Sequence, residues 1–341
     1  MKKIILFLII LIGFGLNLFA QDESSGKLSG YMFGDYYYIV KNHNSDLKDQ
    51  HGFWFRRIYF TYDYKINQDW STRLRLEMNQ EGDFTSKIAM VPVVKDAWLR
   101  YKFSGQSIYV GISSTPTWSL IEDVWGYRFL EKTPLDLNKM ASSRDFGIAG
   151  KGKFDEDGIF NYHVMFGNGS SNKQEIDKGK SGMLSLSAKL KNGLILEFYG
   201  DYADHAGNTD TYILQGFAAF QMENFRIGAQ YAYQLLQQGS ESDKWLRLAS
   251  VFAVGDVSEN VSLLARVDRT FNPNPKGDDI AYIPLDPTAK YTLLIFGVDW
   301  HPIKNVKIIP NIEYVSYSKN SEGVTPDEDL FSRITFYWSF N

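Results

Sequence analysis

The sequence predicts an all-β protein: a transmembrane antiparallel β-barrel of about 16 strands, with short periplasmic turns and long extracellular loops. Three observations lead to this prediction. Apolar and charged side chains alternate within strand-length segments, short and long connections alternate between those segments, and 16% of the residues are aromatic. After its first twenty residues the chain has no apolar run long enough for a membrane-spanning helix.

The alternation is clearest between Phe53 and Gln80, where two strands flank a tight turn at Asn67. Strands place alternate side chains on opposite faces. One face of this hairpin is apolar and aromatic and the other is charged, which suits a barrel that faces lipid outside and water inside. The apolar rows are Ile58-Phe60-Tyr62 and Leu74-Leu76-Met78; Trp54, Tyr64 and Trp70 lie at strand ends, where an interfacial belt would be. A three-residue turn would place Asp63 opposite Arg73 and Thr61 opposite Arg75.

The same pattern recurs to the last residue and gives sixteen expected strands. They are 28–40, 53–66, 70–80, 94–103, 107–114, 144–154, 158–167, 182–190, 193–203, 211–221, 224–234, 245–255, 260–270, 290–300, 306–317 and 330–340.

Short and long connections alternate strictly along the chain, which predicts that both chain ends lie on the periplasmic side. The last strand carries Ile334, Phe336 and Trp338 on one face and should close the barrel against the first strand. Pro310 cannot donate to a strand ladder, so we expect a bulge there or a different strand boundary. The long connections are 41–52, 81–93, 115–143, 168–181, 204–210, 235–244, 271–289 and 318–329.

The first twenty residues read as a secretory signal peptide, because two lysines precede an apolar run that ends at Ala20. Cleavage before Gln21 would leave residues 21–341 as a single outer-membrane barrel domain; the alternative is one membrane-anchoring helix. The sequence has no Cys, so disulfides do not stabilise the exported chain. We expect a protein of the cell outer membrane of a Gram-negative bacterium, in contact with outer-membrane lipid.

Composition and motifs argue against several other classes. The formal net charge is −4 and no basic stripe appears, which disfavours nucleic acid as a partner. No catalytic motif is present and the five His are scattered, so we expect no enzyme, no cofactor and no metal site. A barrel hydrolase would need a Ser–His pair on one face at the membrane boundary, and no convincing pair is found.

Charged residues on the inward face of the strands are the candidate pore lining. One interpretation is that they pair with one another and keep the lumen wet. The other is that unpaired arginines line the pore and favour anions, as rings of basic residues do. The candidates are Arg57, Arg73, Arg75, Glu77, Arg100, Lys102, Lys151, Lys153, Arg266 and Arg333.

The longest connection, residues 115–143, contains an expected short helix around Leu120–Glu131. Long connections without strand pattern are usually functional, and a barrel of this size is open unless something narrows it. We expect this loop to fold inward as a pore constriction, packed down by Trp118, Trp125 and Tyr127; the alternative is a cap over the extracellular mouth. The constriction candidates are Glu122, Asp123, Arg128 and Glu131.

Four stretches resemble the phosphate-selective porin O and P type family of outer-membrane proteins, in the form found in Bacteroidetes-like bacteria. They are FWFRRIYFTYDYKI, KDAWLRYKF, RDFGIAGKGKF and YHVMFGNGSSNK, and the resemblance is clearest from Phe53 to Lys173. It implies a sixteen-stranded, trimeric porin for anions or small polar solutes, whose channel is lined by an ordered series of arginines and lysines. Candidates for that series are Arg57, Arg73, Arg75 and Arg100; the phosphate specificity itself is not carried over.

Taken together, the residues predict a porin for passive diffusion of small hydrophilic solutes or ions, with anions preferred if the basic wall is unpaired. The alternative is a non-conducting outer-membrane barrel that acts as a structural or partner protein in an envelope complex. Conductance separates these two functions, because a plugged barrel passes no steady current.

Overall fold

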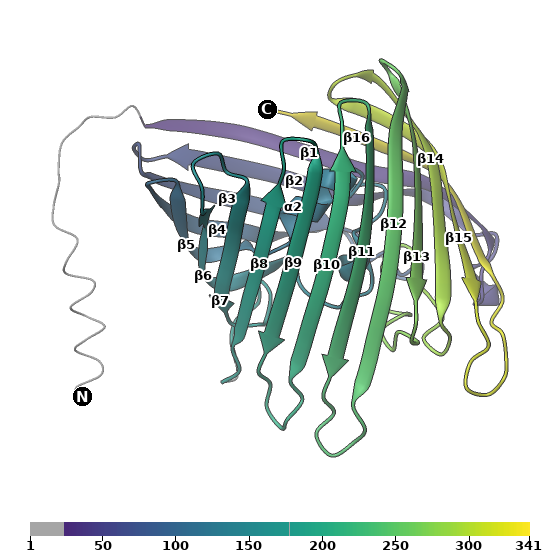
Figure 1. The fold of residues 1–341 in the computed structure, drawn as a ribbon. Coiled ribbons are helices and arrows are strands. Elements are labelled where there is room, and N and C mark those ends of the chain that lie inside the picture. Colours follow the sequence, from purple (N-terminus) through teal and green to yellow (C-terminus); the bar gives the residue numbers. More distant parts are fainter. Residues whose placement is uncertain (1–23, 177) are drawn as a thin grey trace.

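The computed structural model describes residues 24–176 and 178–341, and the predicted signal peptide lies outside them. Sixteen antiparallel strands form a closed barrel, in which each strand pairs with its sequence neighbours and β16 pairs with β1 (Figure 1). The strands are β1 (Ser25–Lys41), β2 (His51–Lys65), β3 (Trp70–Asn79), β4 (Val91–Phe103), β5 (Gln106–Ser114), β6 (Arg144–Lys153), β7 (Phe160–Gly167), β8 (Ser181–Lys189), β9 (Leu194–Ala203), β10 (Thr211–Gln221), β11 (Phe225–Leu236), β12 (Lys244–Ser258), β13 (Val261–Thr270), β14 (Tyr291–Ile303), β15 (Val306–Tyr317) and β16 (Asp329–Phe340).

The predicted strands are confirmed, and no boundary differs by more than three residues. The register of the first hairpin is also as predicted, with Thr61 opposite Arg75 and Asp63 opposite Arg73. Short helices occur only in long connections of the described chain: the 3-10 turn η1 (Ser45–Leu47), α2 (Trp118–Trp125) and α3 (Pro134–Leu137). No helix in residues 24–176 or 178–341 has the length and apolar character needed to span a membrane.

Closure removes the free sheet edges, since β1 and β16 pair from Gly30 opposite Phe340 onward. The expectation of a bulge or a different boundary at Pro310 is wrong. Pro310 lies opposite Ile334 in an unshifted ladder with β16. On its other side, pairing with β14 skips the positions between Gly297 and Trp300, and this gap accommodates a residue without an N–H.

Two register shifts turn consecutive charged residues into the barrel. Between β1 and β2, Phe33 pairs with Arg57 but Gly34 pairs with Phe55, so Arg56 is an extra residue. Between β3 and β4, Arg75 pairs with Asp96 but Leu76 pairs with Val94, so Lys95 is extra. Because a bulge lets two neighbouring side chains project to the same side, the wall gains charges that strict alternation would turn outward.

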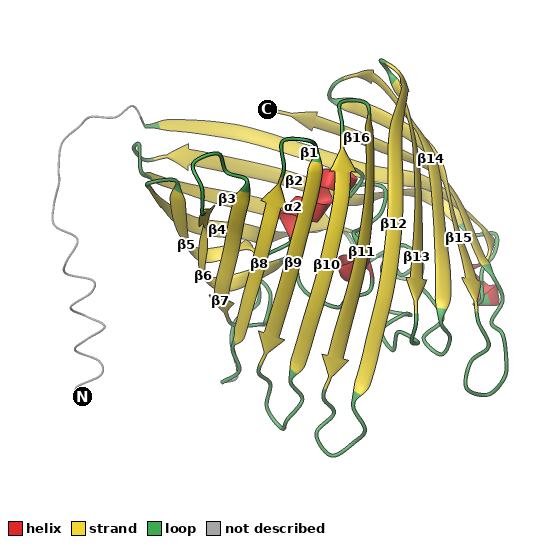
Figure 2. Cartoon of the chain, viewed as in Figure 1, coloured by secondary structure: helices red, strands yellow, loops and turns green. Residues whose placement is uncertain are grey.

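The interior is divided into an apolar part and a charged part. Inward side chains of β10 and β12–β15 form a packed apolar surface, and residues of the 115–143 loop lie against it. Strands β2–β6 face the same interior with charged side chains. Figure 2 shows the helical turns of the loop within the outline of the barrel. The buried apolar wall residues include Phe217, Phe252, Val254, Leu264, Ile295 and Ile309.

Phe60→Arg tests the assignment of faces. Phe60 is 41% exposed on the outer face of β2. An Arg on a lipid-facing strand is expected to destabilise the folded barrel by ~2–4 kcal/mol near the bilayer midplane and by about 0–1 kcal/mol near an interface. We therefore expect a large loss of unfolding free energy in lipid vesicles for Phe60→Arg and a small one for Phe53→Arg, which lies near the long-loop end of the same face. Equal stability of Phe60→Arg and the parent would contradict the assignment.

Candidate functional site: the charged lumen

The loop of residues 115–143 forms one side of the site. In α2 the apolar residues Trp118, Ile121 and Trp125 recur at helical spacing and are buried, while Glu122 and Asp123 lie on the other face. Gly126 ends the helix with φ 72°, a left-handed conformation that favours glycine. Because the apolar face packs on the barrel wall, the polar face of α2 is directed to the remaining space in the lumen.

Polar contacts fix the loop to the apolar part of the wall. Tyr127 donates its hydroxyl to Asp299 at 2.9 Å, and Arg266 donates to the carbonyl oxygen of Lys132 at 2.6 Å. Farther along, Tyr291 donates to the Asn138 side chain at 2.7 Å. These contacts come from strands β13 and β14, so they fix the loop between Tyr127 and Asn138.

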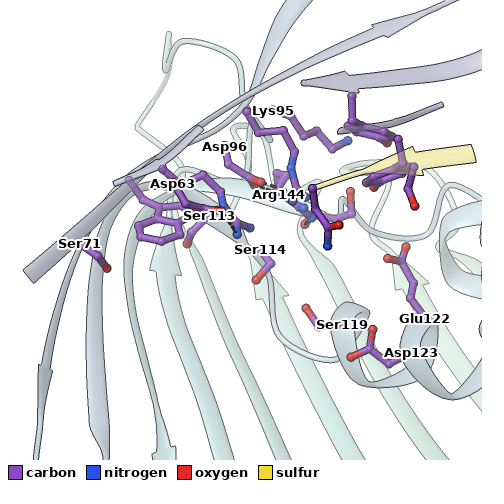
Figure 3. Close-up of a pocket in the computed structure, with 18 of the residues that line it drawn as sticks. Asp63, Ser71, Lys95, Asp96, Ser113, Ser114, Ser119, Glu122, Asp123 and Arg144 are labelled. Carbon is purple, nitrogen blue, oxygen red and sulfur yellow. Dashed lines mark hydrogen bonds and ion pairs between the residues drawn. The ribbon is translucent and has the colours of Figure 1, made fainter. Parts of the chain in front are cut away.

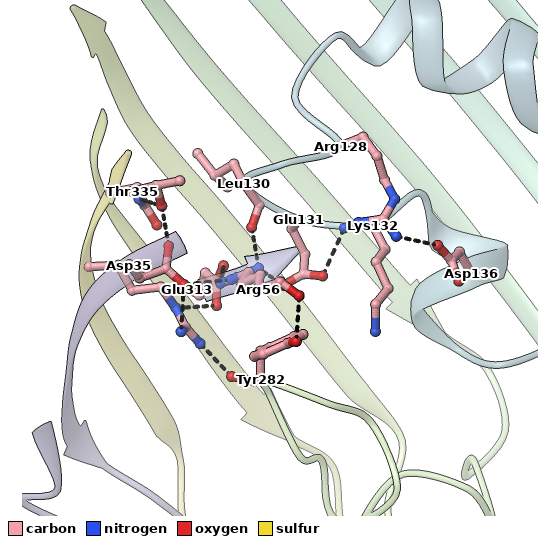
Figure 4. Close-up of polar contacts among 12 residues, drawn as sticks. Asp35, Arg56, Arg128, Leu130, Glu131, Lys132, Asp136, Tyr282, Glu313 and Thr335 are labelled. Carbon is pink, nitrogen blue, oxygen red and sulfur yellow. Dashed lines mark hydrogen bonds and ion pairs between the residues drawn. The ribbon is translucent and has the colours of Figure 1, made fainter. Parts of the chain in front are cut away.

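A buried ion-pair cluster fixes the loop to strands β1, β2, β15 and β16 (Figure 4). Arg56 Nε lies 2.5 Å from Asp35, its Nη1 lies 3.2 Å from Glu131, and Nη1 also donates to the carbonyl oxygen of Leu130. Arg333 pairs with Glu313 at 3.0 Å and lies 3.6 Å from Asp35. The Arg56 cluster, comprising Asp35, Arg56, Glu131, Glu313 and Arg333, therefore joins two arginines and three carboxylates away from water.

The 271–289 loop also reaches into the barrel, through Tyr282. Its hydroxyl accepts from Arg57 at 2.7 Å and lies within hydrogen-bonding distance of the carbonyl oxygens of Arg56 and Gln80. Its carbonyl oxygen accepts from Arg333 at 2.5 Å. This second loop supports the Arg56 cluster from the long-loop side.

A cavity of about 1290 Å³ separates α2 from the charged wall (Figure 3). Asn67 and Asn305 in its lining place one end of the cavity at the short-turn end of the barrel. Its lining contains eleven Lys or Arg side chains and four carboxylates. The cations are Lys65, Arg73, Arg75, Lys95, Arg100, Lys102, Arg128, Arg144, Lys151, Lys304 and Lys307; the acids are Asp63, Asp96, Glu122 and Asp123.

Several of these charges neutralise one another. Asp63 pairs with Arg73 at 2.7 Å. Asp96 pairs with both Arg75 and Arg144. A further set of lining cations has no ion pair among the residues that the structure describes: Lys65, Arg100, Lys102, Lys151 and Lys304. The space beside the wall is therefore positive even after the pairs are discounted.

The loop carboxylate Glu122 has an altered acidity. Burial raises the pKa of Glu122 above its ordinary value; Arg128, 3.3 Å away, lowers it, and the nearby Asp136 raises it again. Glu122 thus takes up a proton at a higher pH than an ordinary carboxylate does.

The residues proposed from the sequence fall into two groups. Those that line the cavity are Arg73, Arg75, Arg100, Lys102 and Lys151 on the wall and Glu122, Asp123 and Arg128 on the loop. Those outside its lining are Arg57, Glu77, Lys153, Arg266, Arg333 and Glu131. Most of the second group have structural contacts. Arg57 pairs with Glu77, Arg266 pairs with Asp268, and Lys153 bonds to the carbonyl oxygen of Glu156 in a turn.

Sequence reasoning missed Asp35, Arg56, Lys95, Asp96 and Arg144. Arg56 and Lys95 were missed because strict alternation allows only one of two neighbouring residues to face inward. The available signal was the pair of adjacent charges within each strand, Arg56-Arg57 and Lys95-Asp96, which is unfavourable unless a bulge turns both inward. Asp35 is followed by three Tyr residues in β1, and Arg144 is the first residue of β6; the alternating pattern is weak at both places.

Arg56→Met tests the anchoring role of the cluster. Removing one partner of a buried ion pair leaves uncompensated charge and typically costs ~3–5 kcal/mol. We expect a loss of that order in unfolding free energy and faster proteolysis within residues 115–143. Arg73→Met is the control, because its pair with Asp63 is partly exposed and should contribute only about 0–1 kcal/mol. Equal effects of the two substitutions would exclude a special anchoring role for Arg56.

Comparisons with known proteins agree with this architecture. The anion-selective porin from Comamonas acidovorans is similar over 93% of this chain and 100% of its own, with a TM-score of 0.70 and 11% identity. OmpT of Vibrio cholerae, solved as a trimer form, covers 94% of this chain and 100% of its own, with a TM-score of 0.65 and 14% identity. Salmonella typhi OmpF, in complex with daunomycin, is similar over 94% of this chain and 99% of its own, with a TM-score of 0.66 and 12% identity.

At these identities the likeness to solved structures shows the fold alone. A comparison with curated protein sequences gave no match. The family model described as phosphate-selective porin O and P matches residues 27–203, just over half of the chain. The chain therefore belongs to the phosphate-selective porin O and P family.

Proposed function

We propose that this barrel passes small hydrophilic anions in preference to cations. Family and fold make the chain an outer-membrane porin for passive diffusion. The observation that carries the anion preference is the lining of the cavity, where eleven cationic side chains outnumber four carboxylates. Basic residues around a narrow pore raise the local concentration of anions and exclude cations.

The 115–143 loop is the proposed constriction. Its support is the two-sided attachment described above, which holds Glu122, Asp123 and Arg128 on one side of the cavity and the basic wall on the other. A solute that passes the cavity would therefore move between α2 and strands β2–β6. The apolar part of the lumen is filled by packed side chains and offers no route for a hydrated ion.

The cellular setting follows from the same reasoning. We place the barrel in the outer membrane of a Gram-negative bacterium, surrounded by lipid, as a homotrimer. The trimer is supported by the resemblance to porins and by the trimer form recorded for Vibrio cholerae OmpT. The proposal assigns no catalytic reaction to the chain, because every charged cluster described above has a structural or pore-lining role.

Single-channel recording in a planar bilayer with a salt gradient tests the function. We expect steady current with a reversal potential shifted from zero toward the equilibrium potential of the anion. Current that favours cations would keep the porin and reject the basic-wall mechanism. A folded, inserted barrel without current would reject diffusion and favour a partner protein of the envelope.

Arg100→Gln and Lys151→Gln should each reduce anion preference, because each removes a lining cation that has no carboxylate partner among the described residues. The reversal potential in a salt gradient should move toward zero, more in the double variant than in either single one. Lys191→Gln is the control: Lys191 pairs with Asp157 in an exposed turn and should not affect selectivity. An unchanged reversal potential in the double variant would place the filter elsewhere.

Acidification should raise anion preference through Glu122. Because its pKa is raised, this carboxylate loses its negative charge early as the pH falls, and the lining becomes more positive. Glu122→Gln should have the higher preference already at neutral pH and lose that part of the pH response. Glu223 lies in a short exposed turn, so Glu223→Gln should show the same pH response of anion preference as the parent. An unaltered pH response in Glu122→Gln would contradict the role of this group.

A further inference from the structure

Two aromatic rings lie on the charged wall of the cavity. Trp98 on β4 and Tyr109 on β5 both line it and stay partly exposed. Their ring centroids are 5.1 Å apart with an interplanar angle of 82°, an edge-to-face contact. Apolar ring surface on a wet wall is not needed to pass inorganic ions, and exposed apolar patches in a binding cavity often contact ligands.

Cations accompany both rings. The guanidinium of Arg73 lies 5.5 Å from the Trp98 centroid, and Nζ of Lys151 lies 5.1 Å from that of Tyr109. Arg100 lies directly opposite Tyr109 in the ladder and two residues after Trp98, so it shares their face. Rings and cations therefore form one row across strands β3–β6, which we call the ring row: Arg73, Trp98, Arg100, Tyr109 and Lys151.

Neutral hydrogen-bonding groups line the same cavity as the ring row. Hydroxyl and amide side chains contribute to the same cavity lining from the wall, from the loop and from the short turns. Such groups can satisfy the hydroxyls of a solute that leaves bulk water. They are Asn67, Ser71, Ser113, Ser114, Ser119, Ser143 and Asn305.

We propose that the ring row is a binding subsite for cyclic acidic sugars, that is, a pyranose ring that carries a carboxylate. The apolar C–H face of the sugar ring would lie on Trp98 or Tyr109. Its carboxylate would lie beside Arg100 and Lys151, which have no carboxylate partner among the described residues. Its hydroxyls would meet the neutral groups of the lining.

This inference rests on the proposed function, since it names a solute class for the same cavity. Each feature alone has a simpler explanation: cations alone suit any anion, and rings alone could only shape the wall. The three together fit a solute with an anionic group, a flat apolar face and several hydroxyls. An inorganic anion would use only the cations.

The test compares glucuronate, which is cyclic, with gluconate, which has an open chain and the same charge. Single-channel chloride current is recorded while each is titrated into the bath, and the concentration for half block is measured. Glucuronate should block the parent at a concentration roughly fivefold or more below that of gluconate, the factor that about 1 kcal/mol from burying the apolar sugar face gives at 25 °C. Trp98→Leu should remove most of this difference, and Trp98→Phe should restore part of it.

Matched variants separate this inference from the porin mechanism. Arg100→Gln should weaken block by both sugar acids, and Tyr101→Leu, on the opposite face of β4, should change neither. Equal block of the parent by glucuronate and gluconate, with chloride current intact, would overturn the subsite but leave the anion porin standing. A Trp98→Leu barrel that conducts and still discriminates the two would overturn it as well. Absence of chloride current in the parent would instead reject the porin.

Discussion

The buried pairing of Arg56 with Asp35 and Glu131 is the interaction on which the lumen depends. A closed barrel of sixteen strands is wide enough to leave an open channel, so its permeability is decided by what is held inside it. The loop of residues 115–143 is fixed on one side by the Arg56 cluster and on the other by Tyr127, Arg266 and Tyr291. Buried charges of this kind are costly unless every partner is present, which makes the loop position specific.

The same arrangement explains why the lumen is asymmetric. Apolar residues of the 115–143 loop, including those of α2, pack against inward side chains of β10 and β12–β15, and this packing excludes water from one side of the lumen. The other side keeps the charged wall of β2–β6 and the cavity beside it. Charge that would have been spread around a wide channel is thereby concentrated along a narrow path, where it acts more strongly on passing ions.

Much of the fold could be predicted from the sequence because side-chain alternation is a local property. The alternation assigns residues such as Ile58 and Phe60 to the outer face, and the polar turns mark where strands end. The site was harder to predict. Alternation shows that Arg57, Arg266 and Arg333 face inward, but it does not show that loops cover them.

Bulges and long-range partners account for the rest. Arg56 and Lys95 are the extra residues at two bulges, and no local pattern places an extra residue of this kind. Glu131 was expected in the constriction, yet it lies in the Arg56 cluster, because its ion-pair partner Arg56 comes from a strand 75 residues away in sequence. Pro310 shows the opposite case, in which a residue with a known local cost sits in a regular ladder because the neighbouring strand leaves its N–H side unpaired.

Cysteine accessibility tests the divided lumen most directly, since the chain has no Cys of its own. Ser119→Cys places a thiol on the exposed face of α2 in the cavity, and Ala219→Cys places one in the packed apolar part. A charged, water-soluble thiol reagent added during single-channel recording should react with Ser119→Cys and reduce its current, while Ala219→Cys should not react. Fast labelling of Ala219→Cys with loss of current, or no effect on Ser119→Cys, would contradict a path confined between α2 and the basic wall.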